Sequence, residues 1–151
     1  KNKANTSSNP IFEYRNTFAT TNKKGDLIQI DSRGNIVTSD LNLRPGHLID
    51  MTSKSFVSFS ENILRVKGIP VELPFGKYTP PKIHYINNTI YVSISDLDTQ
   101  KVYLFYSNGA TVSGFPVYGG SVIDLENADD DKALEALVQS EATSFLIYQI
   151  N

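Results

Sequence analysis

The stretch KIHYINNTIYVSISDLDTQKVYLFYSNGATVSGFPV (82–117) decides the fold, because short apolar runs alternate in it with clusters of turn residues. Three runs stand out first: KIHYI (82–86), IYVSIS (90–95) and VYLFY (102–106). A fourth run lies within SNGATVSGFPV (107–117). Apolar alternation at period two, broken by Gly, Asn and Asp, is typical of antiparallel strands joined by hairpins. We therefore expect one small antiparallel sheet here.

The same succession of runs occurs four times along the chain. The first runs are FEYRN (12–16), HLIDM (47–51), KIHYI (82–86) and SVIDL (121–125), and their starts lie 35, 35 and 39 residues apart. Second and third runs follow in every unit: FATTN (18–22) and LIQID (27–31), FVSFS (56–60) and ILRVK (63–67), IYVSIS and VYLFY, ALVQSE (136–141) and FLIYQI (145–150). The first three units add a fourth run, whereas the last unit stops at Asn151 without one.

This organisation predicts an all-β fold, a β-propeller-like array of about four antiparallel blades with three to four strands each. The units span about 12–46, 47–81, 82–120 and 121–151, and the polar residues 1–11 are expected to form a flexible linker. The alternative is a β-sandwich built from two Greek keys. Since the last unit has no fourth run, we also expect open blade edges that favour self-association.

Composition excludes several classes of function. The 151 residues suit one domain, and a net charge of −2 argues against a nucleic-acid partner, which would need a concentrated basic face. No apolar run approaches the roughly 20 residues of a membrane helix, so membrane insertion is not expected. Cysteine is absent, which excludes disulfides. The chain begins Lys-Asn-Lys without methionine, and we interpret it as a segment of a longer polypeptide.

Residues 102–150 resemble the FG-GAP/VCBS-type propeller repeats of secreted and surface bacterial proteins. The similar features are a strand ending in Asn-Gly, then GFPV, a small-residue step, "DL" and an acidic stretch. The resemblance implies a propeller module of a larger secreted or cell-envelope protein of a bacterium. The resemblance does not by itself specify an activity. The repeats, together with the lack of a reactive set, favour a non-catalytic interaction or scaffold module that binds a protein or glycan partner through blade loops.

The resemblance also implies a calcium site in the acidic stretch. FG-GAP-like repeats hold Ca²⁺ in a D-x-D/N-x-D-G loop, and Asn127, Asp129 and Asp131 have this spacing, with Glu135 as a later carboxylate. Lys132 stands where the loop expects glycine. The alternative is a loop without metal, in which Asp130 or Asp131 caps a short helix in DKALEALV (131–138). No cofactor is expected in that case.

Three residues are candidates for chemistry at a propeller channel. Asp50 and Asp124 follow the same strand register, in LID and VID, and His84 lies on another first run. Paired carboxylates perform glycosidase chemistry, so the alternative function is a carbohydrate-active hydrolase or lyase. The competing interpretation is hydrogen bonding at strand ends. His47 and His84 occupy related places, but a pair without a third ligand does not define a metal site.

Four aromatic residues are candidates for ligand contacts. Tyr78, Tyr85, Phe115 and Tyr118 fall at or near turns, where an exposed ring stacks on a sugar or a peptide. The alternative role for these rings is packing between blades. No Gly-x-Ser-x-Gly elbow is present, and the absence of a reactive set favours the non-catalytic function.

Overall fold

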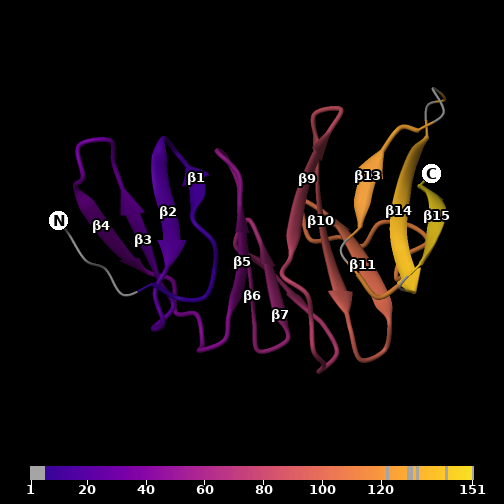
Figure 1. The fold of residues 1–151 in the computed structure, drawn as a ribbon, viewed down its shortest axis with the longest axis horizontal. Coiled ribbons are helices and arrows are strands. Elements are labelled where there is room, and N and C mark those ends of the chain that lie inside the picture. Colours follow the sequence, from indigo (N-terminus) through magenta and orange to yellow (C-terminus); the bar gives the residue numbers. More distant parts are fainter. Residues whose placement is uncertain (1–5, 122, 129–130, 132, 142, 151) are drawn as a thin grey trace.

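The computed structural model describes residues 6–121, 123–128, 131, 133–141 and 143–150, and within these ranges its regular elements are all strands. Four antiparallel sheets follow one another along the chain (Figure 1). Sheet 1 contains β1 (Phe12–Tyr14), β2 (Thr17–Thr21), β3 (Asp26–Ile30) and β4 (Ile36–Asp40). Sheet 2 contains β5 (Leu48–Met51), β6 (Phe56–Ser60), β7 (Ile63–Val66) and β8 (Ile69–Glu72).

The second half of the chain forms the other two sheets. Sheet 3 contains β9 (Lys82–Ile86), β10 (Thr89–Asp96), β11 (Lys101–Tyr106) and β12 (Val117–Tyr118). Sheet 4 contains β13 (Asp124–Glu126), β14 (Leu134–Glu141) and β15 (Ser144–Ile150). The expected all-β array of four sheets with three or four strands each is therefore confirmed, and every expected run overlaps a strand. The overlap is smallest for the fourth run of sheet 3, where only Val117 belongs to β12.

Local turn chemistry explains why each unit forms a meander. Gly34 and Gly109 adopt positive φ in the turns before the fourth runs of sheets 1 and 3, a conformation that glycine reaches without a Cβ clash. Tight turns elsewhere use pairs of residues with positive φ, such as Asn87 and Asn88 between β9 and β10. Such pairs match the right-handed twist of the strands on either side.

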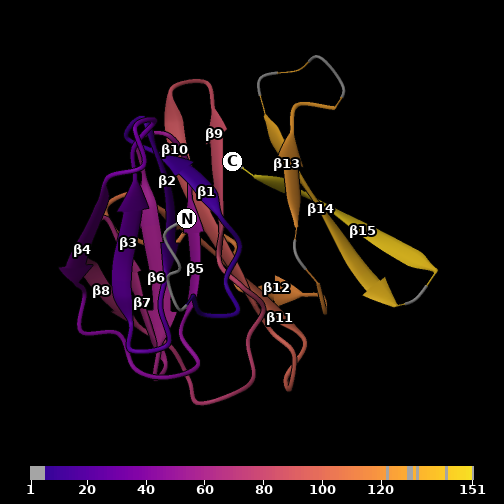
Figure 2. The same cartoon turned by 60° about the vertical axis from the view of Figure 1, so that its left-hand side comes forward.

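The sheets stand side by side in an open row. In each sheet the first strand is the innermost, and contacts between sheets run from β1 to β5, from β5 to β9 and from β9 to β13. Figure 2 shows sheet 4 at the far end of the row from sheet 1, so the described strands do not close into a ring. We call the line formed by β1, β5, β9 and β13 the inner edge.

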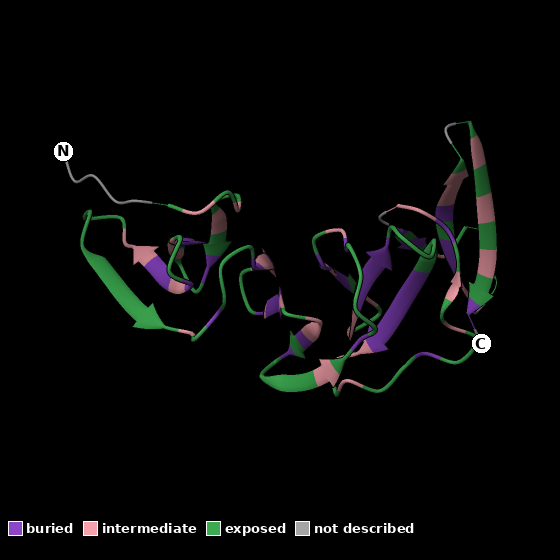
Figure 3. Ribbon diagram, turned by 90° about the horizontal axis from the view of Figure 1, so that it is seen from below, coloured by how far each residue is buried: buried purple, intermediate pink, exposed green. Residues whose placement is uncertain are grey.

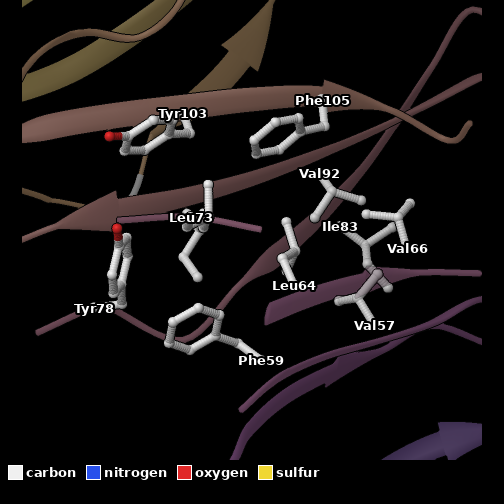
Figure 4. Packing of buried hydrophobic residues seen from close by; sticks show 11 residues of the cluster. Val57, Phe59, Leu64, Val66, Leu73, Tyr78, Ile83, Val92, Tyr103 and Phe105 are labelled. Carbon is white, nitrogen blue, oxygen red and sulfur yellow. The ribbon is translucent and has the colours of Figure 1, made fainter. Parts of the chain in front are cut away.

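Three hydrophobic clusters fill the spaces between neighbouring sheets. The largest lies between sheets 2 and 3, where the ring centroids of Phe59 and Tyr78 are 4.7 Å apart (Figure 4). Alternation of side chains on β11 explains how sheet 3 packs against both of its neighbours. Tyr103 and Phe105 face sheet 2, whereas Val102 and Leu104 belong to the cluster shared with sheet 4. A third cluster joins sheets 1 and 2.

Burial is therefore highest in the middle of the row. Figure 3 shows buried residues concentrated in the strands of sheet 3, while β4 is exposed along its whole length. Within the described part of the chain, sheets 1 and 4 each have one face that no other sheet covers. Phe18 on sheet 1 and Ile147 on sheet 4 are correspondingly exposed.

Two local expectations are wrong. DKALEALV does not form a helix at its described residues, because residues from Leu134 onward form β14, whose Ala136 and Val138 are buried against sheet 3. Tyr78 is not an exposed ring: it is buried, and its hydroxyl donates to the Pro74 carbonyl at 2.8 Å. Tertiary packing outweighs local preference in both cases.

The described part of the N-terminal segment lies against sheets 1 and 2. The Ser7 N–H donates to the Thr21 carbonyl at 2.7 Å, and the Asn9 side chain donates to the His47 carbonyl at 3.2 Å. No helix long and apolar enough to cross a membrane occurs in the residues that the structure describes.

Candidate functional site

Asp50 fastens sheet 2 to sheet 3 at the inner edge. Its Oδ2 accepts the backbone N–H of Ile83 on β9 at 2.7 Å, and its Oδ1 accepts the N–H of Met51 at 2.9 Å. Burial raises the pKa of the Asp50 carboxyl, and the two N–H donors with nearby Lys82 oppose that rise. Each carboxylate oxygen of Asp50 therefore accepts a hydrogen bond from a backbone N–H group.

Lys82 makes the corresponding link between sheets 3 and 4. Its Nζ lies 3.1 Å from Asp124 Oδ1 on β13 and donates to the Ile123 carbonyl at 3.3 Å. The hydrogen bond from Lys82 lowers the pKa of Asp124, which stays ionised at neutral pH. No local pattern singles out Lys82 in the sequence, because its partner lies 42 residues further along the chain.

The His84 side chain is buried on the face of sheet 3 that points away from sheet 2. Ile83 faces sheet 2, and alternation along β9 turns His84 to the opposite face. Its Nε2 lies 2.9 Å from Ser93 Oγ on β10, and its side chain is buried. Burial, with a smaller contribution from Lys82, lowers the pKa of His84 to about 4. The imidazole is therefore neutral at neutral pH.

Asp50, His84 and Asp124 all lie close enough to Lys82 to feel its charge, but they do not bond to one another. The charge of Lys82 acts on all three groups. None of the hydrogen bonds found among the described residues links any two of the three side chains. The two carboxyls differ in a way that suits acid–base work, since burial raises the pKa of Asp50 and Lys82 lowers that of Asp124.

A hollow of about 440 Å³ opens at the inner edge, and we call it the inner hollow. Its polar lining comes from Ser8, Asn9, Asp50 and Lys82. Its apolar lining comes from Phe12, Pro10, Leu48, Ile49, Pro80 and Pro81. A second hollow of about 250 Å³ shares Lys82 and includes Asp124 and Phe145. Lys82 thus stands between two surface depressions.

The predicted aromatic contact residues do not gather at one place. Tyr85, 66% exposed, lines a hollow of about 220 Å³ with residues of sheet 2, and its hydroxyl donates to Asn88. Tyr118 lies on the outermost strand of sheet 3, where its hydroxyl donates to Gln100. Phe115 is half-buried and packs against the cluster between sheets 3 and 4. Tyr85 alone is near the inner edge.

Phe75 is an exposed ring that sequence reasoning missed. It follows β8 in the loop to sheet 3 and is 87% exposed, more than any other large apolar side chain among the described residues. Pro74 and Gly76 flank it. Proline and glycine interrupt strands, so these neighbours indicate that Phe75 lies in a loop. They do not indicate whether its ring is exposed or buried.

The described residues of the acidic stretch lie between β13 and β14 and at their ends. Glu135 is buried at 9% exposure; its Oε2 accepts the Ala128 N–H at 2.8 Å, and its Oε1 has no hydrogen-bond partner. Asn127 Oδ1 is likewise buried without a partner, while its amide nitrogen donates to the Asp131 carbonyl. Asp129 of the predicted calcium set, and Lys132, lie outside the described residues.

These residues fit a cation site in part. Two buried oxygens without partners, on Asn127 and Glu135, are the kind of hard donor that Ca²⁺ uses. The Asp131 carboxylate has other contacts, since Oδ1 accepts the Ala133 N–H at 2.5 Å and Oδ2 accepts from Gln149 at 3.3 Å. No group of three or more His, Cys, Asp or Glu side chains able to hold a metal is found in the described ranges.

His47 has a place in the structure that is separate from the site around Lys82. Its Nε2 lies 2.7 Å from Thr21 Oγ1 on β2, and its Nδ1 lies 2.9 Å from the Arg44 carbonyl. His47 therefore joins sheets 1 and 2, whereas His84 bonds within sheet 3.

The chain matches no protein-family model, and neither a curated protein nor a solved structure is significantly similar to it. The class that the fold defines is an open array of four antiparallel blade-like sheets. Membership of the FG-GAP/VCBS-type repeats remains a prediction from residues 102–150.

Proposed function

We propose that this chain is a non-catalytic interaction module of a larger secreted or cell-envelope bacterial protein, and that it binds a protein or glycan partner at the inner hollow. The observation that carries the proposal is the lining of this hollow, where Asp50, Lys82 and Asn9 lie beside Phe12 and exposed Pro80. Binding sites combine apolar surface with a few placed polar groups in this way.

The charged groups at the inner edge favour binding over catalysis. Asp50 holds two backbone N–H groups, and Asp124 is paired with Lys82. Both carboxylates therefore have structural contacts that account for their positions without a substrate. The loop residues 8–10, 80 and 81 supply most of the remaining lining, and Ser8, Pro10 and Pro80 among them are exposed.

The test fills the hollow without removing a contact. Ser8 is exposed and lines the hollow, so Ser8→Trp places an indole in it, while Ser113→Trp places the same group on an exposed loop elsewhere. Binding is measured against an oligosaccharide array and a displayed peptide library. We expect wild type and Ser113→Trp to bind the same ligands and Ser8→Trp to lose at least tenfold in affinity.

Two outcomes would contradict the proposal. The first is no binding of wild type to any member of either library. The second is equal affinity of Ser8→Trp and wild type, which would move the binding surface away from the inner hollow, toward Tyr85 or Phe75. Ligands from one library only would decide between a glycan and a protein partner.

A carbohydrate-active hydrolase or lyase is the second candidate. The observation in its favour is the opposed pKa directions of Asp50 and Asp124, the pattern of an acid and an ionised carboxylate. Release of reducing sugar from a polysaccharide panel would reveal it. In that case Asp124→Ala must abolish the activity; a fully active Asp124→Ala protein would remove these carboxylates from the chemistry.

For the acidic loop, we infer a calcium ion held by Asn127 and Glu135 together with Asp129 and Asp131. The support is the buried Glu135 Oε1 and Asn127 Oδ1, neither of which has a partner. An unpartnered buried carboxylate oxygen is costly, and a cation would offset that cost. The ion would join Asn127, which follows β13, to Glu135 on β14.

Calcium binding is checked by thermal melts of metal-stripped protein. At a hundredfold excess over the dissociation constant, Ca²⁺ would add about 2.7 kcal/mol, a rise of roughly 5–10 °C in Tm for a chain of this size. We expect Glu135→Gln to abolish the rise. Glu141→Gln, on the same strand but exposed, is the matched control and must retain it. No rise in wild type would contradict the site.

A further inference from the structure

A hollow of about 220 Å³ lies between sheets 2 and 3, and we call it the Tyr85 hollow. Sheet 3 contributes Ile83 and Tyr85 from β9 and Ile90 from β10. Sheet 2 contributes residues 52–55, the turn that joins β5 to β6. The Tyr85 hollow shares no lining residue with the inner hollow. It is therefore a second candidate site, independent of the one proposed above.

The apolar side of this hollow is continuous with the core. Ile83 belongs to the cluster between sheets 2 and 3, and Ile90 packs against that cluster. Tyr85 follows Ile83 by two residues on β9 and so shares its face, and it lies opposite Ile90 in the strand register. Its ring is nevertheless 66% exposed, and its hydroxyl donates to Asn88 Oδ1 at 2.9 Å. That bond holds an exposed aromatic ring in place beside the apolar floor.

The polar side is the turn of residues 52–55, whose sequence Thr-Ser-Lys-Ser carries three hydroxyls and one ammonium group. The Thr52 N–H donates to the Ser55 carbonyl at 2.9 Å, and the Ser55 N–H donates to Thr52 Oγ1 at 3.1 Å. The Ser53 carbonyl accepts the N–H of Arg15, in the turn between β1 and β2, at 3.0 Å. The backbone of this turn is therefore fixed without a ligand.

Two polar groups of the turn have no partner among the described residues. Ser55 is buried at 5% exposure, and its hydroxyl makes no hydrogen bond within that part of the chain. A buried hydroxyl without a hydrogen bond costs free energy. Lys54 is exposed and forms no ion pair with a described residue, and the lining contains no acidic side chain. A ligand with a hydroxyl and a negative charge would supply both missing partners.

We propose that the Tyr85 hollow binds a hexuronate, the acidic sugar unit of an anionic glycan. A sugar ring has a face of C–H groups, which stacks on the exposed Tyr85 ring. A hydroxyl at the edge of the sugar bonds Ser55, and the carboxylate pairs with the ammonium group of Lys54. The volume of about 220 Å³ is small for a drug-sized ligand and suits one such sugar unit.

Other small ligands would use only part of this lining. A neutral sugar leaves the charge of Lys54 without a partner. An inorganic anion or an acidic peptide side chain pairs with Lys54 but has no flat apolar face to cover Tyr85 and Ile90, and burial of apolar surface is what stabilises such contacts. The combination of an aromatic ring, a buried hydroxyl and an unpaired ammonium group therefore selects a sugar ring that carries an acid.

Isothermal titration calorimetry with defined probes tests this choice of ligand. The probes are trimers of galacturonate, glucuronate and mannuronate, the methyl ester of each trimer, and triglutamate. An ester keeps the sugar ring without the charge, and triglutamate keeps the charge without the ring. We expect at least one uronate trimer to bind at least tenfold more tightly than its ester and than triglutamate. Equal affinity for the acid and its ester, or for the acid and triglutamate, overturns the proposal, as does no binding of any uronate trimer at millimolar concentration.

Variants locate the binding at the Tyr85 hollow. Tyr85→Ala is expected to lose at least tenfold in affinity, whereas Tyr85→Phe keeps the ring and binds as wild type does. Lys54→Gln is expected to bind the uronate no more tightly than its ester. The matched controls are Tyr118→Ala on β12 and Lys67→Gln between β7 and β8, both at exposed positions, and both must keep wild-type affinity. Equal losses for Tyr85→Ala and Tyr118→Ala would place the ligand elsewhere and overturn the assignment.

Ser55→Ala separates ligand binding from folding. Since the hydroxyl has no partner in the described part of the chain, its removal is expected to leave Tm unchanged and to weaken uronate binding about three- to tenfold. A lower Tm with unchanged affinity would overturn this contact. Ser8→Trp blocks the inner hollow and is expected to leave uronate binding unchanged, so failure of the function proposed there and failure of this site are distinguishable.

Discussion

At the residue scale, His84 makes folding stability depend on pH. Its pKa is about 4 in the folded chain, compared with 6.5 for an ordinary exposed histidine. The unfolded state therefore takes up a proton first, and stability falls as the pH is lowered from 6.5 toward 4, by up to about 3 kcal/mol. Urea unfolding across this range measures the slope.

The variants isolate His84 from the carboxylates that also titrate in acid. His84→Gln removes the titrating ring and is expected to lose this part of the slope, whereas Ser93→Ala removes the hydrogen bond and keeps the ring. Burial raises the pKa of Asp50, so that group acts in the opposite direction: protonation near its folded pKa favours the native state. Equal slopes for wild type and His84→Gln would refute the assignment.

At the element scale, Gly119 sets how closely sheet 4 packs on sheet 3. A Cβ at this position would lie 2.1 Å from Val138 Cγ1 on β14 and 3.1 Å from Val102 Cγ2 on β11. Gly119→Ala must therefore push the sheets apart, and we expect it to lower the free energy of unfolding by about 1–3 kcal/mol. Chemical denaturation with an unchanged m-value measures the loss.

Gly120→Ala is the control for this packing, because a Cβ there would meet no atom within 4 Å. It is expected to change stability by less than about 0.5 kcal/mol. Equal losses for the two variants would mean that the glycines matter for backbone conformation rather than for the distance between sheets.

The strands were predictable from sequence, whereas the contacts between sheets were not. Short apolar runs bounded by turn residues mark β9, β10 and β11 directly. The run in β11 is continuous, because sheets 2 and 4 bury both of its faces. The helix expected after the acidic cluster is wrong because Leu134, Ala136 and Val138 also satisfy period two, and burial against sheet 3 outweighs helix propensity.

The contacts made by the candidate site residues could likewise not be predicted from the sequence. Asp50 and Asp124 could be singled out because they share a register, but their bonds to Ile83 and Lys82 depend on how neighbouring sheets stack. Burial of Glu135 and of Tyr78 depends on the same stacking. A pattern within one strand carries no information about the strand of the next sheet that will lie beside it.

At the scale of the whole molecule, the open row predicts a gradient of local stability. Each sheet packs only on its neighbours, as in repeat proteins, so sheet 3 is stabilised from both sides and sheets 1 and 4 from one side each. Amide hydrogen exchange should be slowest in β10 and β11 and fastest in β4 and β15. Mass spectrometry of peptides from each sheet measures the order.

The gradient also separates a stacked row from a single cooperative unit. Equal protection in all four sheets would show that the chain unfolds only as a whole and would contradict the nearest-neighbour argument.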